Sequence, residues 1–160
     1  MTGTTERKEV RCLGITLILS FIEGRGIDSR SVLAGLPYDE DYLRTTSNWI
    51  DRETFFEVER RVRNLFPDEK DLFFQIGLQA SRTKSFGFFR LMANLSGSPF
   101  AIYRIYEKLI TKHLFRFVSV RIVEKGENRA VLEYTFDGPL EQYANFIETV
   151  RGILSATPEA

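Results

Sequence analysis

The fold is decided by residues 114–154, LFRFVSVRIVEKGENRAVLEYTFDGPLEQYANFIETVRGIL, because the spacing of the apolar residues changes within them. Apolar and polar residues alternate over 118–122 and again over 132–136, which is typical of strands with one buried face. The segment EKGEN between these two runs has the composition of a turn. We therefore expect an antiparallel hairpin over about residues 115–136.

After the hairpin the apolar spacing becomes helical. Pro139 suits the first turn of a helix, and the apolar residues of that helix recur at helical spacing: Leu140, Tyr143, Phe146, Ile147, Val150 and Leu154. Two strands alone form a marginal sheet, which leaves two alternatives. Either helices cover the hairpin completely, or further strands follow in a longer protein. We favour the second alternative, in which the chain is an N-terminal fragment.

The rest of the chain is predicted to be helical from its apolar spacing and its helix-end signals. The fold class is therefore α+β, with about six to eight helices and a small antiparallel sheet near the C-terminus. The polar residues 1–9 are expected to form a disordered tail, and residues 10–155 a single domain. The predicted helices before the hairpin cover about residues 10–23, 28–35, 51–66, 69–81, 86–97 and 99–113.

One predicted helix has a well-marked start. Asp51 stands at the N-cap position, and the apolar residues that flank it have the spacing of a hydrophobic staple. Farther along, Glu57 and Glu59 each precede an arginine by four residues. Such i,i+4 pairs are typical of a solvated helix surface, and we assign both glutamates to it.

Composition excludes several classes of protein. The 160 residues hold 22 basic and 22 acidic side chains, so there is no electrostatic footprint for nucleic acid. Cys12 is the only cysteine, which excludes an intramolecular disulfide and a cysteine-built zinc site. The apolar run ITLILSFI is far shorter than the roughly 20 residues that span a bilayer. We expect a cytoplasmic domain that binds neither nucleic acid nor membrane.

Catalytic signatures are also missing from the sequence. It has no Gly-rich phosphate loop, no nucleophile elbow and no histidine pair at metal spacing. His113 is the only histidine, and it falls in the last turn of a predicted helix, where the helix dipole favours it. It shares a helical stripe with Tyr106, so we expect it to face the packed side. We expect neither an enzyme nor a metal site.

Aromatic residues are concentrated between residues 86 and 147, in a chain with 14 phenylalanines. They admit two interpretations, a solid core or a small-molecule cavity. Buried tyrosine hydroxyls need partners, and several that converge beside the hairpin would provide a cavity with polar handles.

Two parts of the chain resemble known families. The order of elements, ending in AVLEYTFDGPLEQYANFIETVRGIL, resembles the haem nitric oxide/oxygen binding (H-NOX) fold and its non-haem relatives, which include 4-vinyl reductase-type domains. The stretches SVLAGLPYDEDYLRTTSNWIDRETFFEVERRV and SFGFFRLMANLSGSPFAIYRIYEKLI are similar to input domains of bacterial sensor histidine kinases and to ligand-binding domains of AraC-type regulators. The resemblance covers about residues 12–155.

The resemblance also implies the non-haem form. Haem-binding members hold the propionates with a tyrosine, a serine and an arginine spaced two apart; here Tyr134 matches, but Phe136 and Gly138 occupy the other two positions. The iron-binding histidine would fall near residues 105–106, and His113 lies about two turns later. Buried propionates without cationic partners are costly, so we expect no haem and no other cofactor.

Together these observations predict a non-enzymatic, small-molecule-sensing input domain of a bacterial signal-transduction protein, either a histidine kinase of a two-component system or a transcription regulator. A small hydrophobic molecule would bind in an aromatic pocket, with three tyrosine hydroxyls (103, 134 and 143) as polar handles. The other expected partners are a downstream kinase or regulatory domain in the same chain and a second copy in a homodimer. The alternatives are a dimerisation module with a solid core, and a haem sensor that uses His113. The predicted pocket residues are Phe89, Met92, Tyr103, Tyr106, Leu109, Phe117, Tyr134 and Tyr143.

Overall fold

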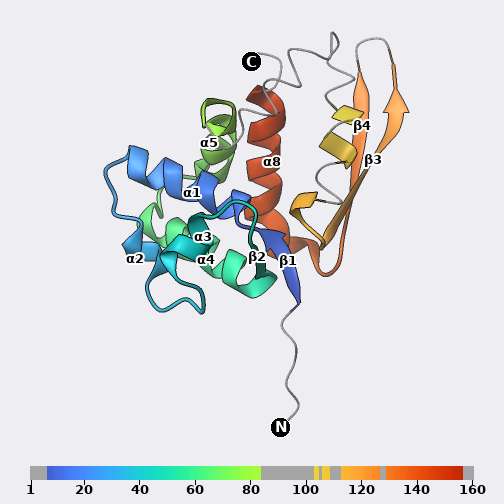
Figure 1. The fold of residues 1–160 in the computed structure, drawn as a ribbon. Coiled ribbons are helices and arrows are strands. Elements are labelled where there is room, and N and C mark those ends of the chain that lie inside the picture. The colour runs from blue at the N-terminus through green and yellow to red at the C-terminus, as the bar shows by residue number, and fades with distance from the viewer. Residues whose placement is uncertain (1–6, 84–102, 105, 109–112, 127–128, 157–160) are drawn as a thin grey trace.

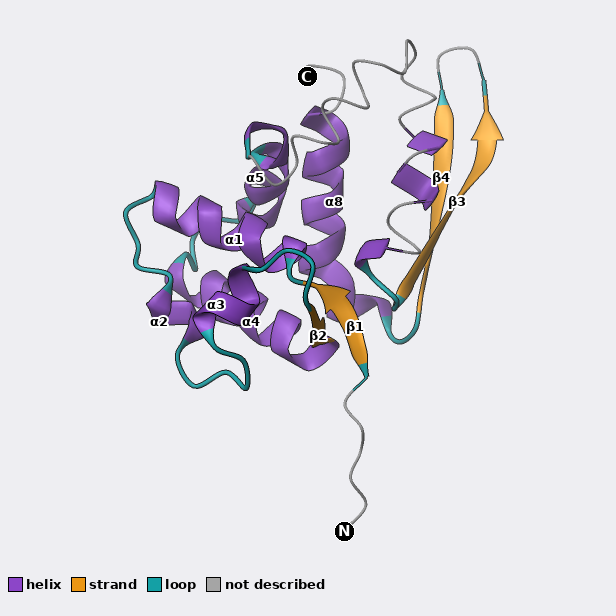
Figure 2. Ribbon diagram, viewed as in Figure 1, coloured by secondary structure: helices purple, strands orange, loops and turns teal. Residues whose placement is uncertain are grey.

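The structure is a computed structural model that describes residues 7–83, 103–104, 106–108, 113–126 and 129–156. Within these residues it has the predicted α+β architecture, with helices and two small antiparallel sheets (Figures 1 and 2). The predicted helix over 86–97 lies outside the described residues. The elements are β1 (Lys8–Arg11), α1 (Leu13–Gly24), α2 (Arg30–Leu33), α3 (Glu40–Arg44), β2 (Trp49–Asp51), α4 (Arg52–Leu65), α5 (Leu72–Leu78), η1 (Ala80–Arg82), β3 (Val118–Lys125), β4 (Ala130–Phe136), η4 (Leu140–Tyr143) and α8 (Ala144–Ala156).

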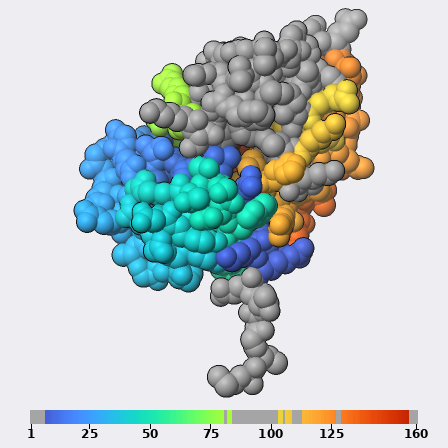
Figure 3. Space-filling model, in the orientation of Figure 1, coloured from blue at the N-terminus to red at the C-terminus, as the bar shows by residue number. Residues whose placement is uncertain are grey.

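The hairpin prediction is confirmed. Strands β3 and β4 pair antiparallel from Val118 opposite Phe136 to Lys125 opposite Ala130. The register shifts once, between Ile122 and Glu124. The hairpin stands beside α8, which lies between it and α5 (Figure 1). In the space-filling view, most of the N-terminal half (light blue to teal) lies on the left and the hairpin (orange) on the right, while β1 (dark blue) adjoins the orange region (Figure 3).

The N-terminal segment differs from the prediction. We expected a disordered tail over residues 1–9 and a helix from Val10, but β1 forms over Lys8–Arg11 and pairs with β2, and α1 starts at Leu13. The reason is tertiary. The side-chain carboxylate of Glu9 is buried and lies within 3.4 Å of the Arg52 guanidinium. The backbone carbonyl of Glu9 accepts a hydrogen bond from the backbone N–H of Arg116 at 2.8 Å. Residues 1–6 lie outside the described part.

The start of α4 confirms the capping prediction. A carboxylate oxygen of Asp51 accepts from the backbone N–H of Thr54 at 2.6 Å, and the other accepts from the Thr54 hydroxyl at 2.9 Å. Ile50 and Phe55, on either side, are buried. The helix ends at Leu65, two residues before a proline that cannot continue it.

Helices α5 and α8 pack side by side with their backbones in contact. A Cβ added to Gly77 would lie 2.0 Å from the carbonyl oxygen of Thr149, and one added to Gly152 would lie 2.1 Å from that of Phe74. No side chain other than hydrogen fits at either position, because such contacts are far shorter than van der Waals separation. The two glycines therefore set the separation between α5 and α8.

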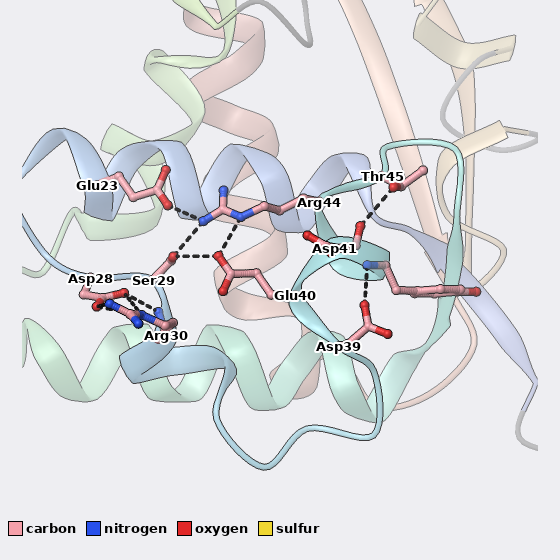
Figure 4. Close-up of polar contacts among 10 residues, drawn as sticks. Glu23, Asp28, Ser29, Arg30, Asp39, Glu40, Asp41, Arg44 and Thr45 are labelled. Atoms are coloured by element: carbon pink, nitrogen blue, oxygen red, sulfur yellow. Dashed lines mark hydrogen bonds and ion pairs between the residues drawn. The ribbon is translucent and has the colours of Figure 1, made fainter.

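Arg44 joins three N-terminal elements on the surface (Figure 4). Its guanidinium donates to Glu23 of α1 at 2.5 Å, to Ser29 at the start of α2 at 2.7 Å, and to Glu40 of α3 at 2.8 Å. The hydrogen bond from Arg44 lowers the pKa of Glu23. Asp39 caps α3 by accepting from Tyr42 N at 2.7 Å, so the acidic run before α3 has a structural role.

Two kinds of functional feature are absent from the described residues. None of their helices combines the length and the apolar character that crossing a membrane requires. None of their histidine, cysteine, aspartate and glutamate side chains forms a group of three or more suited to a metal ion.

Candidate functional site

A largely enclosed cavity lies inside the fold where α1, α4 and α8 meet the residues that precede the hairpin. It has a volume of about 40 Å³, counted as the space open to the centre of a water-sized sphere. Its surface is almost wholly apolar. The described wall residues are Leu13, Gly14, Leu17, Ile18, Phe55, Glu59, Tyr106, Leu114, Phe115, Phe146, Thr149, Val150 and Ile153.

Glu59 is the one acidic side chain in this described wall. It lies on the inward stripe of α4 together with Phe55, Val58 and Val62, because positions three or four apart share a helix face. Glu59 is only 2% exposed, and its Oε1 has no hydrogen-bond partner. The solvated surface predicted for Glu59 is therefore wrong, whereas Glu57 does pair with Arg61 at 2.6 Å.

The protonation of Glu59 follows from this burial. Desolvation raises the pKa of its carboxyl to about 8, and the charge of Arg63 offsets only part of that rise. The hydrogen bonds of the Arg63 guanidinium go to other groups, the Glu69 carbonyl at 2.7 Å and Asn145 at 3.3 Å. At neutral pH the cavity wall thus contains a carboxylic acid that carries its proton.

Tyr106 is the second wall residue with a buried polar atom that has no hydrogen-bond partner. It is 5% exposed, and its hydroxyl has no hydrogen-bond partner. Burial raises its pKa well above the ordinary value, and Tyr134 adds to the rise. The two phenols are therefore close enough to affect each other's pKa, although neither hydroxyl has a hydrogen bond of acceptable geometry.

Tyr134 belongs to a neighbouring groove between β4 and α8. The groove has a volume of about 250 Å³ by the same measure. Phe146 and Val150 line both the groove and the cavity, so these two side chains form a wall between them. The described groove residues are Tyr134, Phe136, Leu140, Phe146, Ile147, Val150, Arg151 and Leu154.

Tyr143 does not act as a polar handle of the cavity. Its hydroxyl donates to the Asp137 carbonyl at 2.6 Å and accepts from the Arg52 guanidinium at 2.9 Å. Its ring stacks on Phe117 at 5.2 Å and on Phe136 at 4.5 Å between centroids. Tyr143 and Phe117 are therefore parts of a packed aromatic cluster beside the cavity and are not among its described wall residues.

The remaining predicted pocket residues contribute less to the site. Tyr103 is half-buried on the helical segment that carries Tyr106 and is not among the described wall residues. Phe89, Met92 and Leu109 lie outside the described residues. Of the eight predicted residues, the described structure places Tyr106 in the cavity and Tyr134 in the adjoining groove.

The residues present do not fit a haem. His113 is exposed, contrary to the prediction that it faces the packed side, so it is not placed to bind iron inside the fold. Tyr106, near the position where the family places its iron ligand, provides a phenol with a raised pKa. Phe136 and Gly138 offer no side-chain donor for a propionate.

Sequence reasoning missed Glu59, although a signal was present. Glu59 lies four residues after Phe55 and three before Val62, both on the apolar stripe, so helical geometry alone places its side chain inward. The i,i+4 arginine pointed to the opposite conclusion.

The thiol of Cys12 is also buried, and burial raises its pKa to about 11, which makes it unreactive.

Comparison with protein-family models, with curated proteins and with solved structures finds no match to this chain.

Proposed function

We propose that this chain is a non-enzymatic, small-molecule-sensing input domain that binds its ligand in the cavity between α1, α4 and α8. The observation that supports this most directly is the cavity itself, a largely enclosed apolar space whose wall residues include Glu59 and Tyr106, each of which has a buried polar atom without a hydrogen-bond partner. Concave apolar sites with a few convergent polar groups are typical of small-molecule binding. Unpartnered polar groups are rare in ordinary cores.

The position of α8 suggests how binding is transmitted. Phe146, Thr149, Val150 and Ile153 of this helix face the cavity, so a ligand there contacts α8 over two turns. The ligand would shift the equilibrium toward a state with α8 displaced if it binds that state more tightly than the undisplaced one. The size of the shift is set by the ratio of the two affinities. The displacement would then reach a downstream kinase or regulatory module in a bacterial, cytoplasmic signalling protein, in accord with the H-NOX-like resemblance.

The chemistry of the wall favours binding over catalysis. Its described polar side chains are Glu59, Tyr106 and Thr149, and the Thr149 hydroxyl donates to the Asn145 carbonyl at 3.0 Å. A nucleophile hydrogen-bonded to a base, which covalent catalysis requires, is not among these described side chains.

Xenon tests whether the cavity accepts a ligand. Xenon binds small apolar cavities without needing polar contacts, so methyl NMR spectra of the 160-residue chain should show saturable shifts at Leu17, Ile18 and Val150. Gly14→Ala should reduce these shifts, because its Cβ would lie 3.1 Å from the Phe55 ring. Gly24→Ala, on the same helix with no atom within 4 Å, is the matched control.

Two results separate the outcomes of this experiment. Shifts that continue along α8 beyond the cavity, in the wild type and in Gly24→Ala, would support a sensing role. The absence of any saturable shift in the wild type would refute the proposal.

A second candidate function is a protein–protein module that forms a dimer of this chain. The groove between β4 and α8 favours it, since its surface is apolar and Leu140 at its rim is 59% exposed. Sedimentation of the 160-residue chain over a range of concentrations separates the two candidates. A tight dimer that is indifferent to cavity ligands would support the module, and a monomer with a ligand-dependent melting temperature would support the sensor.

A further inference from the structure

We propose that a cationic surface patch around β1 is the docking site for an acidic segment of a partner protein. The cationic patch consists of three cations and the aromatic residues beneath them: Lys8, Arg11, Arg116, Tyr38, Tyr42 and Trp49. This inference goes beyond the proposed function, because none of these residues belongs to the described wall of the cavity or of the groove.

The backbone brings the cationic patch together from distant parts of the chain. On one edge of β1, Arg11 lies opposite Trp49 of β2. On the other edge, the backbone N–H of Arg116 donates to the Glu9 carbonyl at 2.8 Å, and its guanidinium donates to the Lys8 carbonyl at 3.2 Å. Strand β1 therefore lies between β2 and the segment before β3, and side chains from all three meet there.

Aromatic rings hold the three cations in place. The guanidinium carbons of Arg11 and Arg116 lie 5.5 and 4.3 Å from the centre of the Trp49 ring. The Nζ of Lys8 lies 5.1 Å from the centre of the Tyr42 ring and donates to its hydroxyl at 2.9 Å. Rings attract cations to their faces. The positive charges are therefore arranged before a partner arrives, which reduces the entropy cost of binding.

The cationic patch has no anion of its own among the described residues. No described carboxylate forms an ion pair with any of its three cations. Asp51 lies opposite Lys8 in the ladder, but it is buried and its oxygens accept from Thr54. The carboxylate of Glu9 is buried beside Arg52. Two of the three positive charges share one ring and repel each other, so an incoming anion relieves that repulsion.

The donors of the cationic patch are accessible and suit carboxylates. Lys8 and Arg116 are exposed, and Arg11 is half-buried. Strand β1 lies at the surface beside the orange region (Figure 3). A guanidinium donates through a planar fork that matches both oxygens of a carboxylate. Two closely spaced carboxylates of one peptide can therefore pair with both arginines.

A protein segment fits the cationic patch better than a nucleic acid does. Proteins that bind single strands combine an extended positive groove with aromatic rings that stack on bases. Here Trp49 is already in contact with two guanidinium groups, and the basic and acidic side chains of the chain balance at 22 each. Arginine, tryptophan and tyrosine are the residues that most often dominate the binding energy of protein interfaces.

Binding of a model peptide tests the proposal. The probe is an eight-residue peptide of alternating aspartate and glutamate, and the corresponding asparagine–glutamine peptide is the control. Fluorescence anisotropy of each dye-labelled peptide, titrated with the 160-residue chain in 20 mM NaCl, measures Kd. Trp49 is the only tryptophan of the chain, so a change in its fluorescence with unlabelled peptide locates the binding at the cationic patch. We expect saturable binding and this fluorescence change with the acidic peptide alone.

Variants connect the binding to the two arginines. Arg11→Gln/Arg116→Gln removes both forks and should raise Kd about tenfold. Arg11→Lys/Arg116→Lys keeps the charges without the forks and should raise Kd about threefold. Arg82→Gln is the matched control, because Arg82 of η1 is exposed and forms no ion pair with a described carboxylate; its Kd should stay within about twofold of wild type. Thermal melting followed by circular dichroism checks that each variant is folded, and the lysine variant carries the comparison if the glutamine variant is not.

Four results would overturn the inference. The acidic peptide does not bind, or binds without changing Trp49 fluorescence, which places it elsewhere. Arg82→Gln weakens binding as much as the double glutamine variant, which makes the attraction a general charge effect. The lysine variant binds as tightly as wild type, which excludes forked recognition. An eight-nucleotide oligothymidine binds more tightly than the acidic peptide, which makes the surface one for nucleic acid. The xenon experiment tests the proposed function separately, and its result is independent of these.

Discussion

Glu59→Gln should remove a large pH dependence from the stability of this protein. The folded pKa of Glu59 is about 8 and its ordinary value is 4.5. Each pKa unit corresponds to about 1.4 kcal/mol, so the buried carboxyl should change the free energy of unfolding by about 5 kcal/mol across this interval. Glutamine has the same shape and does not titrate, so it isolates the effect of ionisation.

The sign of the effect follows from proton binding. Between pH 4.5 and 8 the folded protein keeps the Glu59 proton, while the unfolded chain releases it. Stability therefore falls as pH rises through this range, by up to about 1.4 kcal/mol per pH unit, and this contribution becomes constant above pH 8. Below pH 4.5 both states are protonated and the penalty disappears.

Urea unfolding followed by circular dichroism, at one-unit steps from pH 5 to pH 9, measures the difference between wild type and Glu59→Gln. That difference should shift in favour of the variant by several kcal/mol over this range. Glu57→Gln is the matched control, because Arg61 and Arg60 lower the pKa of Glu57 and confine its titration to more acidic pH. Parallel stability curves for wild type and Glu59→Gln would refute the assignment of a protonated acid in the cavity.

Two further substitutions test the packing around the site. Gly77→Ala should lower the free energy of unfolding by at least about 3 kcal/mol, since its Cβ would lie 2.0 Å from a carbonyl oxygen of α8. Gly24→Ala is the control, because the space around Gly24 is open. It should be neutral or stabilising by up to about 1 kcal/mol. Urea unfolding of both variants decides this, and equal stabilities would contradict the backbone contact between α5 and α8. Tyr143→Phe should cost about 1 kcal/mol by removing the hydrogen bonds of the Tyr143 hydroxyl to the Asp137 carbonyl and to Arg52, while Arg52 keeps its own hydrogen bond to that carbonyl at 2.9 Å. Xenon binding in the cavity should be unchanged. A loss of xenon binding without a loss of stability would place Tyr143 in the cavity after all.

The features that sequence analysis predicted correctly are governed by local rules. Alternation fixed the hairpin, and side-chain chemistry identified Asp51 as the cap of α4. Strand β1 was missed because its partner β2 lies about forty residues away in sequence, and four residues carry too little periodicity to show pairing at that distance.

The candidate site was harder to predict than the fold. The aromatic concentration pointed to the correct region, and Tyr106 is in the cavity wall. Tyr143 was predicted to be a polar handle of the pocket because the contact that brings Arg52, at the start of α4, to its hydroxyl is a tertiary feature. The turn that presents the Asp137 carbonyl to the same hydroxyl carries no periodic signal. Glu59 was assigned to solvent because an arginine follows it at i+4, and that pairing rule holds only where both side chains face water.

The contact between Gly77 and Gly152 also bears on how the chain folds as it is made. The two residues are 75 positions apart in the sequence, and synthesis at about 5–20 residues per second takes roughly 4–15 s to cover that distance. During this interval α5 lacks α8, against which its backbone packs, although Arg63 of α4, which lies over the Phe73 ring at 4.9 Å, has already been made. Helix α8 therefore completes one side of the core and one wall of the cavity, and a chain that ends before Ala144 would lack both of these contributions.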